Sequence, residues 1–253
     1  LEKIFKNMPN TNIQKNEYYK NMISQIEDRQ IDLSTKIPPK LNAELRTYQK
    51  IGYKWLRTLE QYKMGGILAD DMGLGKTIQL LAVILSYVQK NKGNVKPSII
   101  ICPSSLALNW YNEIQKFTPT LKALVISDDY LERKRKIEEI GKYQVIITSY
   151  DSLKRDIDLY ENYCFKYVVA DEAQYIKNNN TKNSKAIKTI NAETKFALTG
   201  TPIENSLSEL WSIFDFIMPG YLYKYKKFKE LYETPIIKEQ NEDVMNKLKK
   251  QIE

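Results

Sequence analysis

The sequence predicts an α/β fold with a central, mostly parallel sheet, helices on both of its faces and helical extensions at both ends. Short apolar runs rich in β-branched residues alternate with amphipathic helical stretches. Continuous apolar strands of this kind are typical of a parallel sheet that is buried on both faces. The chain has 253 residues, of which 42% are hydrophobic and 28% charged, and is therefore long and apolar enough to bury such a sheet.

The alternating elements start near residue 41. The first helix, over residues 46–62, places Tyr48, Ile51, Trp55 and Leu59 on one face at spacings of three and four. The strands are predicted at residues 66–69, 98–102, 123–126, 145–148, 167–170 and 196–199. The remaining helices are predicted at residues 77–89, 106–117, 130–140, 151–159, 182–190 and 206–218.

Two segments flank the predicted main domain, which covers residues 41–220. Residues 1–40 are polar, rich in lysine and asparagine, and end in two prolines that break a helix. We interpret them as the end of a preceding region or a linker. Residues 221–253 are rich in tyrosine and lysine and then strongly helical, without a strand signal. We interpret them as the start of a helical insertion or an inter-lobe segment.

The composition excludes several classes of chemistry and location. The sequence contains no histidine, which excludes Ser-His-Asp catalysis, histidine general bases and the common zinc sites. Cys102 and Cys164 lie in or beside apolar runs and are predicted to be small buried hydrophobic residues in a reducing cytoplasm. The apolar runs are too short to span a bilayer, and the first ten residues do not resemble a secretory signal.

The net charge of +8 permits a polyanionic partner without demonstrating one. The positive charge is spread along the chain, and its densest cluster is the basic run at residues 133–136. Glutamates flank that run on both sides. We therefore favour a solvated helix face over a phosphate-binding patch for this run.

Residues 70–77 have the context of a phosphate-binding loop, because they follow a predicted strand and open a predicted helix. Gly73 and Gly75 allow backbone amides to turn toward a phosphate, Lys76 supplies a positive charge, and the Thr77 hydroxyl can bind Mg²⁺. A glycine-capped helix start alone does not explain Lys76 and Thr77 directly after two glycines. The loop departs from the general pattern at Asp70, where a glycine is usual. We predict that the nucleotide is bound by Asp71, Met72, Gly73, Leu74, Gly75, Lys76 and Thr77.

Asp171 and Glu172 follow the apolar run at residues 167–170 and should lie at the carboxyl edge of the sheet, where ligands bind. Asp171 is predicted to hold Mg²⁺ together with Thr77, and Glu172 to polarise the attacking water. Adjacent acidic residues at a solvated strand end are the simpler alternative. The phosphate-binding loop upstream favours the catalytic interpretation, with Lys76, Asp171 and Glu172 as the catalytic residues.

The loop and the sequence Asp-Glu-Ala-Gln at residues 171–174 together resemble the superfamily-two helicase-type motors. Further segments resemble the Swi/Snf family of double-stranded-DNA translocases, without interruption over about residues 41–220. The matching segments are residues 45–49 (the adenine-reading motif), 70–79 (motif I), 101–110 (motif Ia), 147–150 (motif Ib), 176–178, 198–205 (motif III) and 209–220. Many members carry histidine at the position of Gln174, whereas bacterial members often carry glutamine, so the resemblance indicates a bacterial, nucleoid-associated protein.

The resemblance implies a RecA-like first motor lobe that binds ATP and Mg²⁺ and uses ATP hydrolysis to move along duplex DNA. Arg46 and Gln49 would bind ATP, with Gln49 pairing with the base. The residues that would couple hydrolysis to movement are Gln174, Thr199, Gly200 and Thr201. The residues that would contact the DNA backbone are Ser104, Ser105, Ser149, Lys177 and Asn178. Position alone favours loop or helix-cap roles for the serines, with Ser105 a plausible cap, whereas the resemblance favours DNA contacts.

In such motors the catalytic arginines come from a second RecA-like lobe of the same chain, and no second run of this kind follows residue 220. We therefore expect a monomeric fragment of a longer protein that binds ATP weakly and hydrolyses it poorly or not at all. Two alternatives remain open. One is a non-catalytic lobe that serves as a DNA- or protein-binding scaffold. The other is an RNA helicase of the D-E-A-D/H kind, which typically carries Ser-Ala-Thr in place of residues 198–202.

Overall fold

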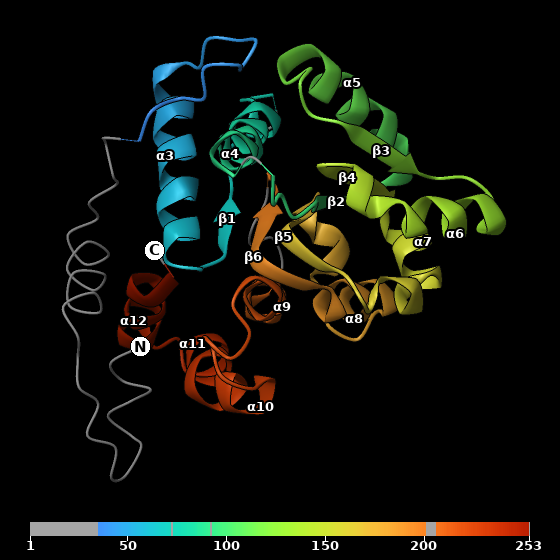
Figure 1. The fold of residues 1–253 in the computed structure, drawn as a ribbon. Helices are drawn as coiled ribbons and strands as arrows, with labels where there is room; N and C mark the ends of the chain where they lie inside the picture. The colour runs from blue at the N-terminus through green and yellow to red at the C-terminus, as the bar shows by residue number, and fades with distance from the viewer. Residues whose placement is uncertain (1–34, 72, 92, 201–205, 253) are drawn as a thin grey trace, which may run out of the picture.

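The computed structural model describes residues 35–71, 73–91, 93–200 and 206–252. Within these residues a six-stranded, all-parallel sheet has the order β1-β6-β5-β2-β4-β3 (Figure 1). The strands are β1 (Gly66–Leu68), β2 (Ser98–Cys102), β3 (Ala123–Ile126), β4 (Val145–Ser149), β5 (Cys164–Asp171) and β6 (Asn191–Leu198). Every predicted strand is therefore confirmed.

The predicted helices are also confirmed, with the stretch at residues 151–159 divided into a short α-helix and a 3-10 turn. The α-helices are α3 (Thr47–Gln61), α4 (Lys76–Lys90), α5 (Ala107–Phe117), α6 (Tyr130–Glu138), α7 (Tyr150–Arg155), α8 (Lys182–Thr189), α9 (Leu207–Ile217), α10 (Tyr225–Phe228), α11 (Thr234–Lys238) and α12 (Glu242–Ile252). The 3-10 turns are η1 (Ser104–Leu106), η2 (Ile140–Lys142), η3 (Ile157–Tyr160) and η4 (Ala173–Ile176), and η5 (Lys229–Glu233) is a π-helical turn.

Alternate side chains of the strands enter two hydrophobic cores, one on each face of the sheet. In β2, Ile100 and Cys102 pack with α3, α4 and α5, whereas Ile99 and Ile101 pack with α6, α7, α8 and α9 (Figure 1). The central strands are thus apolar on both faces, as the continuous apolar runs predict.

The buried face of α3 differs from the predicted one. Tyr48 and Ile51 are 37% and 48% exposed, and the residues that α3 buries are Gln49, Tyr53 and Leu56. The prediction is confirmed in part, because Trp55 and Leu59 pack against the core, and it is wrong for Tyr48 and Ile51, whose place on the buried face is taken by a polar side chain. A side chain at Gly52 would overlap the amide of Gln79, so α3 and α4 approach closely there.

Both flanking segments pack onto the sheet domain in their described parts. The Tyr53 hydroxyl donates to the backbone oxygen of Lys36 at 2.9 Å, and Ile37 packs against the core that contains Tyr53 and Leu56. The C-terminal segment is helical, as predicted. Its buried side chains, Leu222, Phe228, Tyr232 and Leu248, join the core that α9 closes.

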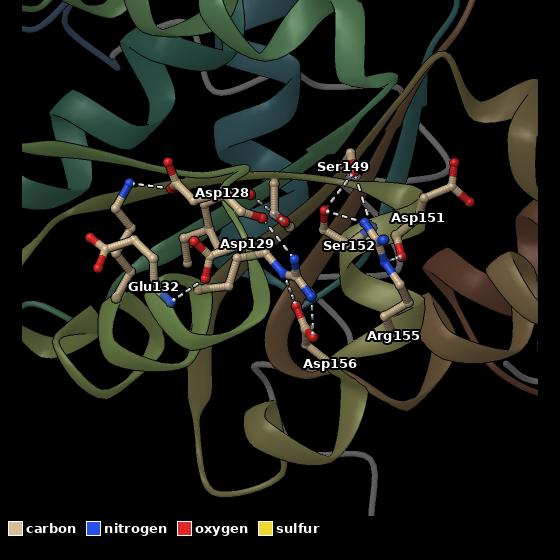
Figure 2. A network of polar contacts seen from close by, with 12 residues as sticks. Asp128, Asp129, Glu132, Ser149, Asp151, Ser152, Arg155 and Asp156 are labelled. Atoms are coloured by element: carbon tan, nitrogen blue, oxygen red, sulfur yellow. Dashed lines mark hydrogen bonds and ion pairs between the residues drawn. The ribbon is translucent and has the colours of Figure 1, made fainter.

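The basic run at residues 133–136 is not a uniformly solvated face, and this interpretation is wrong for Arg133. Its guanidinium is buried and binds both carboxylate oxygens of Asp156, with Nε–Oδ2 at 2.5 Å and Nη2–Oδ1 at 2.9 Å (Figure 2). It also donates to the backbone oxygen of Asp128 at 2.7 Å. Lys134 and Arg135 are exposed, as the sequence predicts. The difference between Arg133 and its neighbours follows from helix geometry, because Arg133 faces the core and the next two side chains point to solvent.

The two cysteines also differ from each other. Cys102 is buried in β2, as predicted, and burial raises the pKa of its thiol to about 12. Cys164 is exposed, contrary to prediction, because it is the first residue of β5 and the buried part of that strand starts one residue later. No helix in the described part of the chain is long and apolar enough to cross a membrane.

Candidate active site

The order of the strands gathers the predicted nucleotide-binding segments at one edge. The phosphate-binding loop follows β1, Thr199 follows β6, and Asp171 ends β5, and these strands are neighbours in the sheet. The backbone N–H of Thr199 donates to the backbone oxygen of Leu68 at 3.2 Å, which holds the two loops together. Met72 and Thr201 lie outside the described residues.

The phosphate-binding loop turns at two left-handed glycines, Gly73 and Gly75, each with φ of 80°. A Cβ atom on Gly75 would lie 2.5 Å from Nε2 of Gln49, so conformation and space both require glycine there. Helix α4 then begins at Lys76, with Thr77 in its first turn. The Lys76 ammonium folds back over the loop and donates to the backbone oxygens of Asp70 at 2.7 Å and Asp71 at 3.2 Å.

Asp70, which departs from the usual pattern, binds the helix that follows the loop. Its Oδ2 accepts a hydrogen bond from Nε2 of Gln79 at 2.9 Å. Gln79 is fully buried in α4 and also donates to the backbone oxygen of Gly75 at 3.3 Å. The aspartate therefore fastens the start of the loop to α4. This partner, nine residues further along the chain, could not be located from the local sequence pattern.

The start of α3 is bonded to the same loop. Nε2 of Gln49 donates to the backbone oxygen of Leu74 at 3.0 Å, and its Oε1 accepts from the backbone N–H of Arg46 at 2.9 Å. The Tyr48 hydroxyl donates to the same Leu74 oxygen at 3.0 Å. Gln49 thus lies beside the loop with both ends of its amide bonded within the protein, and its pairing with adenine stays a prediction.

The acidic pair lies at the end of β5. Oδ2 of Asp171 accepts a hydrogen bond from the indole Nε1 of Trp110 at 2.7 Å, and Oδ1 accepts from the backbone N–H of Glu172 at 3.0 Å. Burial raises the pKa of the Asp171 carboxyl, while the Trp110 hydrogen bond and the charge of Lys76 oppose this shift. Glu172 has φ of 51°, a left-handed conformation that is uncommon for a residue other than glycine.

Gln174 joins the acidic pair to the end of β6. Its Nε2 donates to Oε2 of Glu172 at 2.8 Å, and its Oε1 accepts from the Thr199 hydroxyl at 3.4 Å. The side-chain amide can connect a carboxylate to a hydroxyl because it both donates and accepts. Gly200 follows Thr199 at this edge and is half-buried.

The predicted DNA-contact residues fall into an exposed group and an inward group. Ser104 and Ser105 are exposed in η1, directly after β2. Asn178 is also exposed, and its side chain accepts from the backbone N–H of Asn180 at 3.0 Å. Ser149 and Lys177 are both buried. The Lys177 ammonium also forms an ion pair with Glu209, with Nζ and Oε2 3.5 Å apart.

The helix-cap role suggested for Ser105 belongs to Ser149 instead. Helix α5 has Leu106 at its N-cap and no side-chain cap bond. Ser149 caps α7: its Oγ accepts from the backbone N–H of Ser152 and donates to the Ser152 hydroxyl, both at 3.1 Å (Figure 2). Each serine precedes a helix in the sequence, and the backbone path at the helix start decides which of them caps it.

The donors around the phosphate-binding loop fit Mg²⁺ rather than a softer metal. Thr77 and Asp171 supply oxygen atoms, and Mg²⁺ commonly uses one or two such groups together with water and phosphate oxygens. No cluster of three or more histidine, cysteine or acidic side chains that could hold a metal by itself occurs among the described residues.

Comparisons with known proteins agree on one family. The profile of the family described as SNF2-related domain matches residues 48–253. An uncharacterized ATP-dependent helicase of Mycoplasma genitalium is 46% identical over 206 residues, which are 81% of this chain and 19% of that protein. The TATA-binding protein-associated factor MOT1 of Saccharomyces cerevisiae is 37% identical over 252 residues, which are 96% of this chain and 14% of that protein.

A solved structure extends the likeness to three dimensions. The Sulfolobus solfataricus SWI2/SNF2 ATPase core in complex with dsDNA matches with a TM-score of 0.77 and 42% identity, over 85% of this chain and 44% of that chain. The chain spans less than a fifth of the length of the two relatives above and less than half of this ATPase core. Profile, sequence identity and fold together show that the chain belongs to the SNF2-related domain family.

Proposed function

We propose that this chain is the first lobe of a Swi/Snf-type motor, which binds ATP and Mg²⁺ and, with a second lobe, couples ATP hydrolysis to movement along duplex DNA. The observation that supports this most is the convergence of Lys76, Asp171 and the Gln174–Thr199 contact at one edge of the sheet. A scaffold protein would not require these groups together.

The residues of the loop divide the work of holding the nucleotide. Phosphate oxygens would take the place of the two backbone oxygens that now bind the Lys76 ammonium. Thr77 and Asp171 would hold Mg²⁺, which when bound neutralises phosphate charge and fixes the geometry of the γ-phosphate. Tyr48 and Gln49 fix the Leu74 turn from α3, which places Gln49 beside the nucleotide for contact with the base.

The Glu172–Gln174–Thr199 chain is the proposed coupling device. Glu172 would orient and deprotonate the attacking water, and its hydrogen bond from Gln174 keeps the carboxylate in place. Loss of the γ-phosphate would change the environment of Thr199, and Gln174 would carry that change between the two loops. Gly200 and Thr201 would follow the movement of Thr199.

The proposed DNA surface lies at the same carboxyl edge of the sheet, where the chain leaves β2, β4 and β5. Ser104, Ser105 and Asn178 are exposed and suited to contact phosphate groups without reading sequence. Ser149 and Lys177 would have to exchange their present partners before they could contact DNA. The solved ATPase core with dsDNA supports a duplex substrate over the structured RNA of the D-E-A-D/H alternative.

The proposal is tested in the full-length protein by ATP hydrolysis with and without duplex DNA, and by binding of a fluorescent ATP analogue. Lys76→Ala should abolish nucleotide binding, because it removes the charge that faces the phosphates. Glu172→Gln should keep binding and lower the turnover by about 10²–10⁴-fold, the usual contribution of a general base. Lys134→Ala, on the exposed side of α6, is the matched control and should change neither quantity. Unaltered binding by Lys76→Ala would reject the proposal.

A further inference from the structure

The metal-binding carboxylate is held from elements that do not carry the phosphate-binding loop. The Trp110 indole of α5 donates to Oδ2 of Asp171 at 2.7 Å. The Tyr150 hydroxyl, from the first residue of α7, donates to the backbone oxygen of Asp171 at 2.8 Å. One residue thus fixes the carboxylate of Asp171 and the other fixes its backbone.

Both of these residues are joined by short, rigid paths to the proposed DNA surface. Helix α5 continues directly from η1, so Trp110 lies about one and a half helical turns beyond the exposed Ser104 and Ser105. Tyr150 follows Ser149 in the chain. The strands that lead to these two positions pair with each other, with Cys102 opposite Ser149. The two paths therefore begin side by side.

The contacts are buried and held in place by their neighbours. Trp110 and Tyr150 are each 2% exposed. The Tyr150 ring stacks on Tyr175 with its centroid 5.2 Å away and an interplanar angle of 5°. Burial raises the pKa of the Tyr150 hydroxyl, so it remains a neutral donor at physiological pH. A shift of either helix start must therefore move Asp171 or break these hydrogen bonds.

We propose that Trp110 and Tyr150 are positioning residues that orient Asp171 for Mg²⁺ and transmit the binding of duplex DNA at η1 and at the start of α7 to the nucleotide site. This inference rests on the proposed function. It adds a route by which DNA raises the affinity for the Mg²⁺–nucleotide complex. By thermodynamic linkage, Mg²⁺–nucleotide raises the affinity for DNA by the same factor.

The test uses Trp110→Phe and Tyr150→Phe in the full-length protein, because each removes one donor and keeps an aromatic ring. Binding of a fluorescent ATP analogue is measured in EDTA and then as a function of Mg²⁺ concentration. Trp110→Phe should leave binding in EDTA unchanged and raise the half-saturating Mg²⁺ concentration about tenfold or more, as loss of a ligand's supporting hydrogen bond generally does. Tyr150→Phe should shift it in the same direction by less, because it holds only the backbone.

Trp211→Phe is the matched control, since Trp211 is also buried and its indole donates to a backbone oxygen, that of Tyr223, at 3.1 Å. It should leave the Mg²⁺ dependence unchanged. Duplex DNA should lower the half-saturating Mg²⁺ concentration of the unmodified protein and of Trp211→Phe, and should lower that of Trp110→Phe by a smaller factor, because only the contact through Tyr150 is then left.

Three results would overturn the inference: an unchanged Mg²⁺ dependence in Trp110→Phe, an equal loss of binding in EDTA that marks a merely structural role, or the same shift in Trp211→Phe. If the unmodified protein shows Mg²⁺-dependent binding and DNA-stimulated hydrolysis, such a result rejects only the role of Trp110 and Tyr150. If the unmodified protein shows neither, the proposed function itself fails, and the inference with it.

Discussion

Lys195 shows how one half-buried side chain makes stability depend on pH. It lies on β6, its Nζ donates to the backbone oxygen of Lys188 at 3.0 Å, and the Phe216 ring lies 5.4 Å from the same atom. Burial lowers the pKa of the Lys195 ammonium to about 8, against 10.5 when unfolded. Below pH 8 the folded state therefore carries the whole cost of desolvating this charge. That cost is relieved as the pH rises toward 10.5, because the folded state loses its proton first.

We predict that Lys195→Met stabilises the protein at pH 7 and that its advantage shrinks as the pH rises from 8 toward 10. The gain at pH 7 should be on the order of 1 kcal/mol, since the loss of the bond to Lys188 offsets part of the relief. Urea unfolding of both proteins at pH 7 and 9.5 measures the difference. The exposed substitution Lys134→Met is the control and should show no such trend. A constant or growing advantage would contradict the prediction.

At the residue scale, the candidate site residues could be predicted from the sequence better than the partners and orientation of their side chains. Lys76 and Asp171 could be chosen because their neighbours in the chain fix their context, a glycine loop for Lys76 and a strand end for Asp171, whereas Gln174 was chosen from the family resemblance. Trp110 and Gln79 could not be chosen, because their partners are 61 and 9 residues away and meet them only through the fold. Arg133 and Lys134 are adjacent and identical in charge, and only packing separates the buried one from the exposed one.

At the element scale, the Arg133–Asp156 ion pair joins α6 to the segment between α7 and η3. The side chains of both residues are almost fully buried, and the pair makes two hydrogen bonds. The position of α6 on the sheet therefore depends on a charge that has no access to water.

We predict that Asp156→Ala lowers the free energy of unfolding by about 3–5 kcal/mol, because it leaves the buried guanidinium without its partner. The matched control is Glu132→Ala, which removes the solvated partner of Arg135 on the same helix and should leave the stability nearly unchanged. Urea denaturation followed by far-UV circular dichroism measures both. Equal, small effects of the two substitutions would show that the buried pair does not hold α6.

The extents of the elements were predictable where apolar residues fill them and not where polar residues begin them. β2 and β3 match their predicted ranges, because apolar residues fill β3 from end to end and β2 from Ile99 onward. β5 and β6 start earlier than their apolar runs, at Cys164 and Asn191. At the amino ends of these two strands the backbones pair with each other even where the side chains are polar. The order of the strands follows from crossover connections that no local pattern encodes.

At the scale of the whole molecule, the lobe carries one side of the proposed catalytic site. Lys76, Asp171 and Glu172 lie at the open edge of the sheet, and the proposed arginines of the second lobe would have to approach that edge from outside. The residues that bind ATP and Mg²⁺ would then belong to this lobe, and the arginines that stabilise the transition state would belong to the second lobe.

We predict that the isolated 253-residue chain turns over ATP about 10³–10⁵-fold more slowly than the full-length protein, which is the usual contribution of such arginines. Duplex DNA should not accelerate it. Steady-state phosphate release, measured for both proteins at the same ATP and DNA concentrations, tests this. Robust DNA-stimulated turnover by the isolated chain would show that the lobe is catalytically sufficient.

The place of β1 in the sheet also constrains how the protein is made on the ribosome. Among the described residues β1 pairs with β6 alone, with Gly66 opposite Phe196. The loop that follows β1 therefore has no neighbouring strand until the chain has been synthesised past Leu198. A nascent chain must keep this glycine-rich segment unpaired while most of the domain emerges, and long-range closure of this kind is slow. Nucleotide binding by ribosome-bound chains should thus appear late and abruptly, when β6 leaves the exit tunnel.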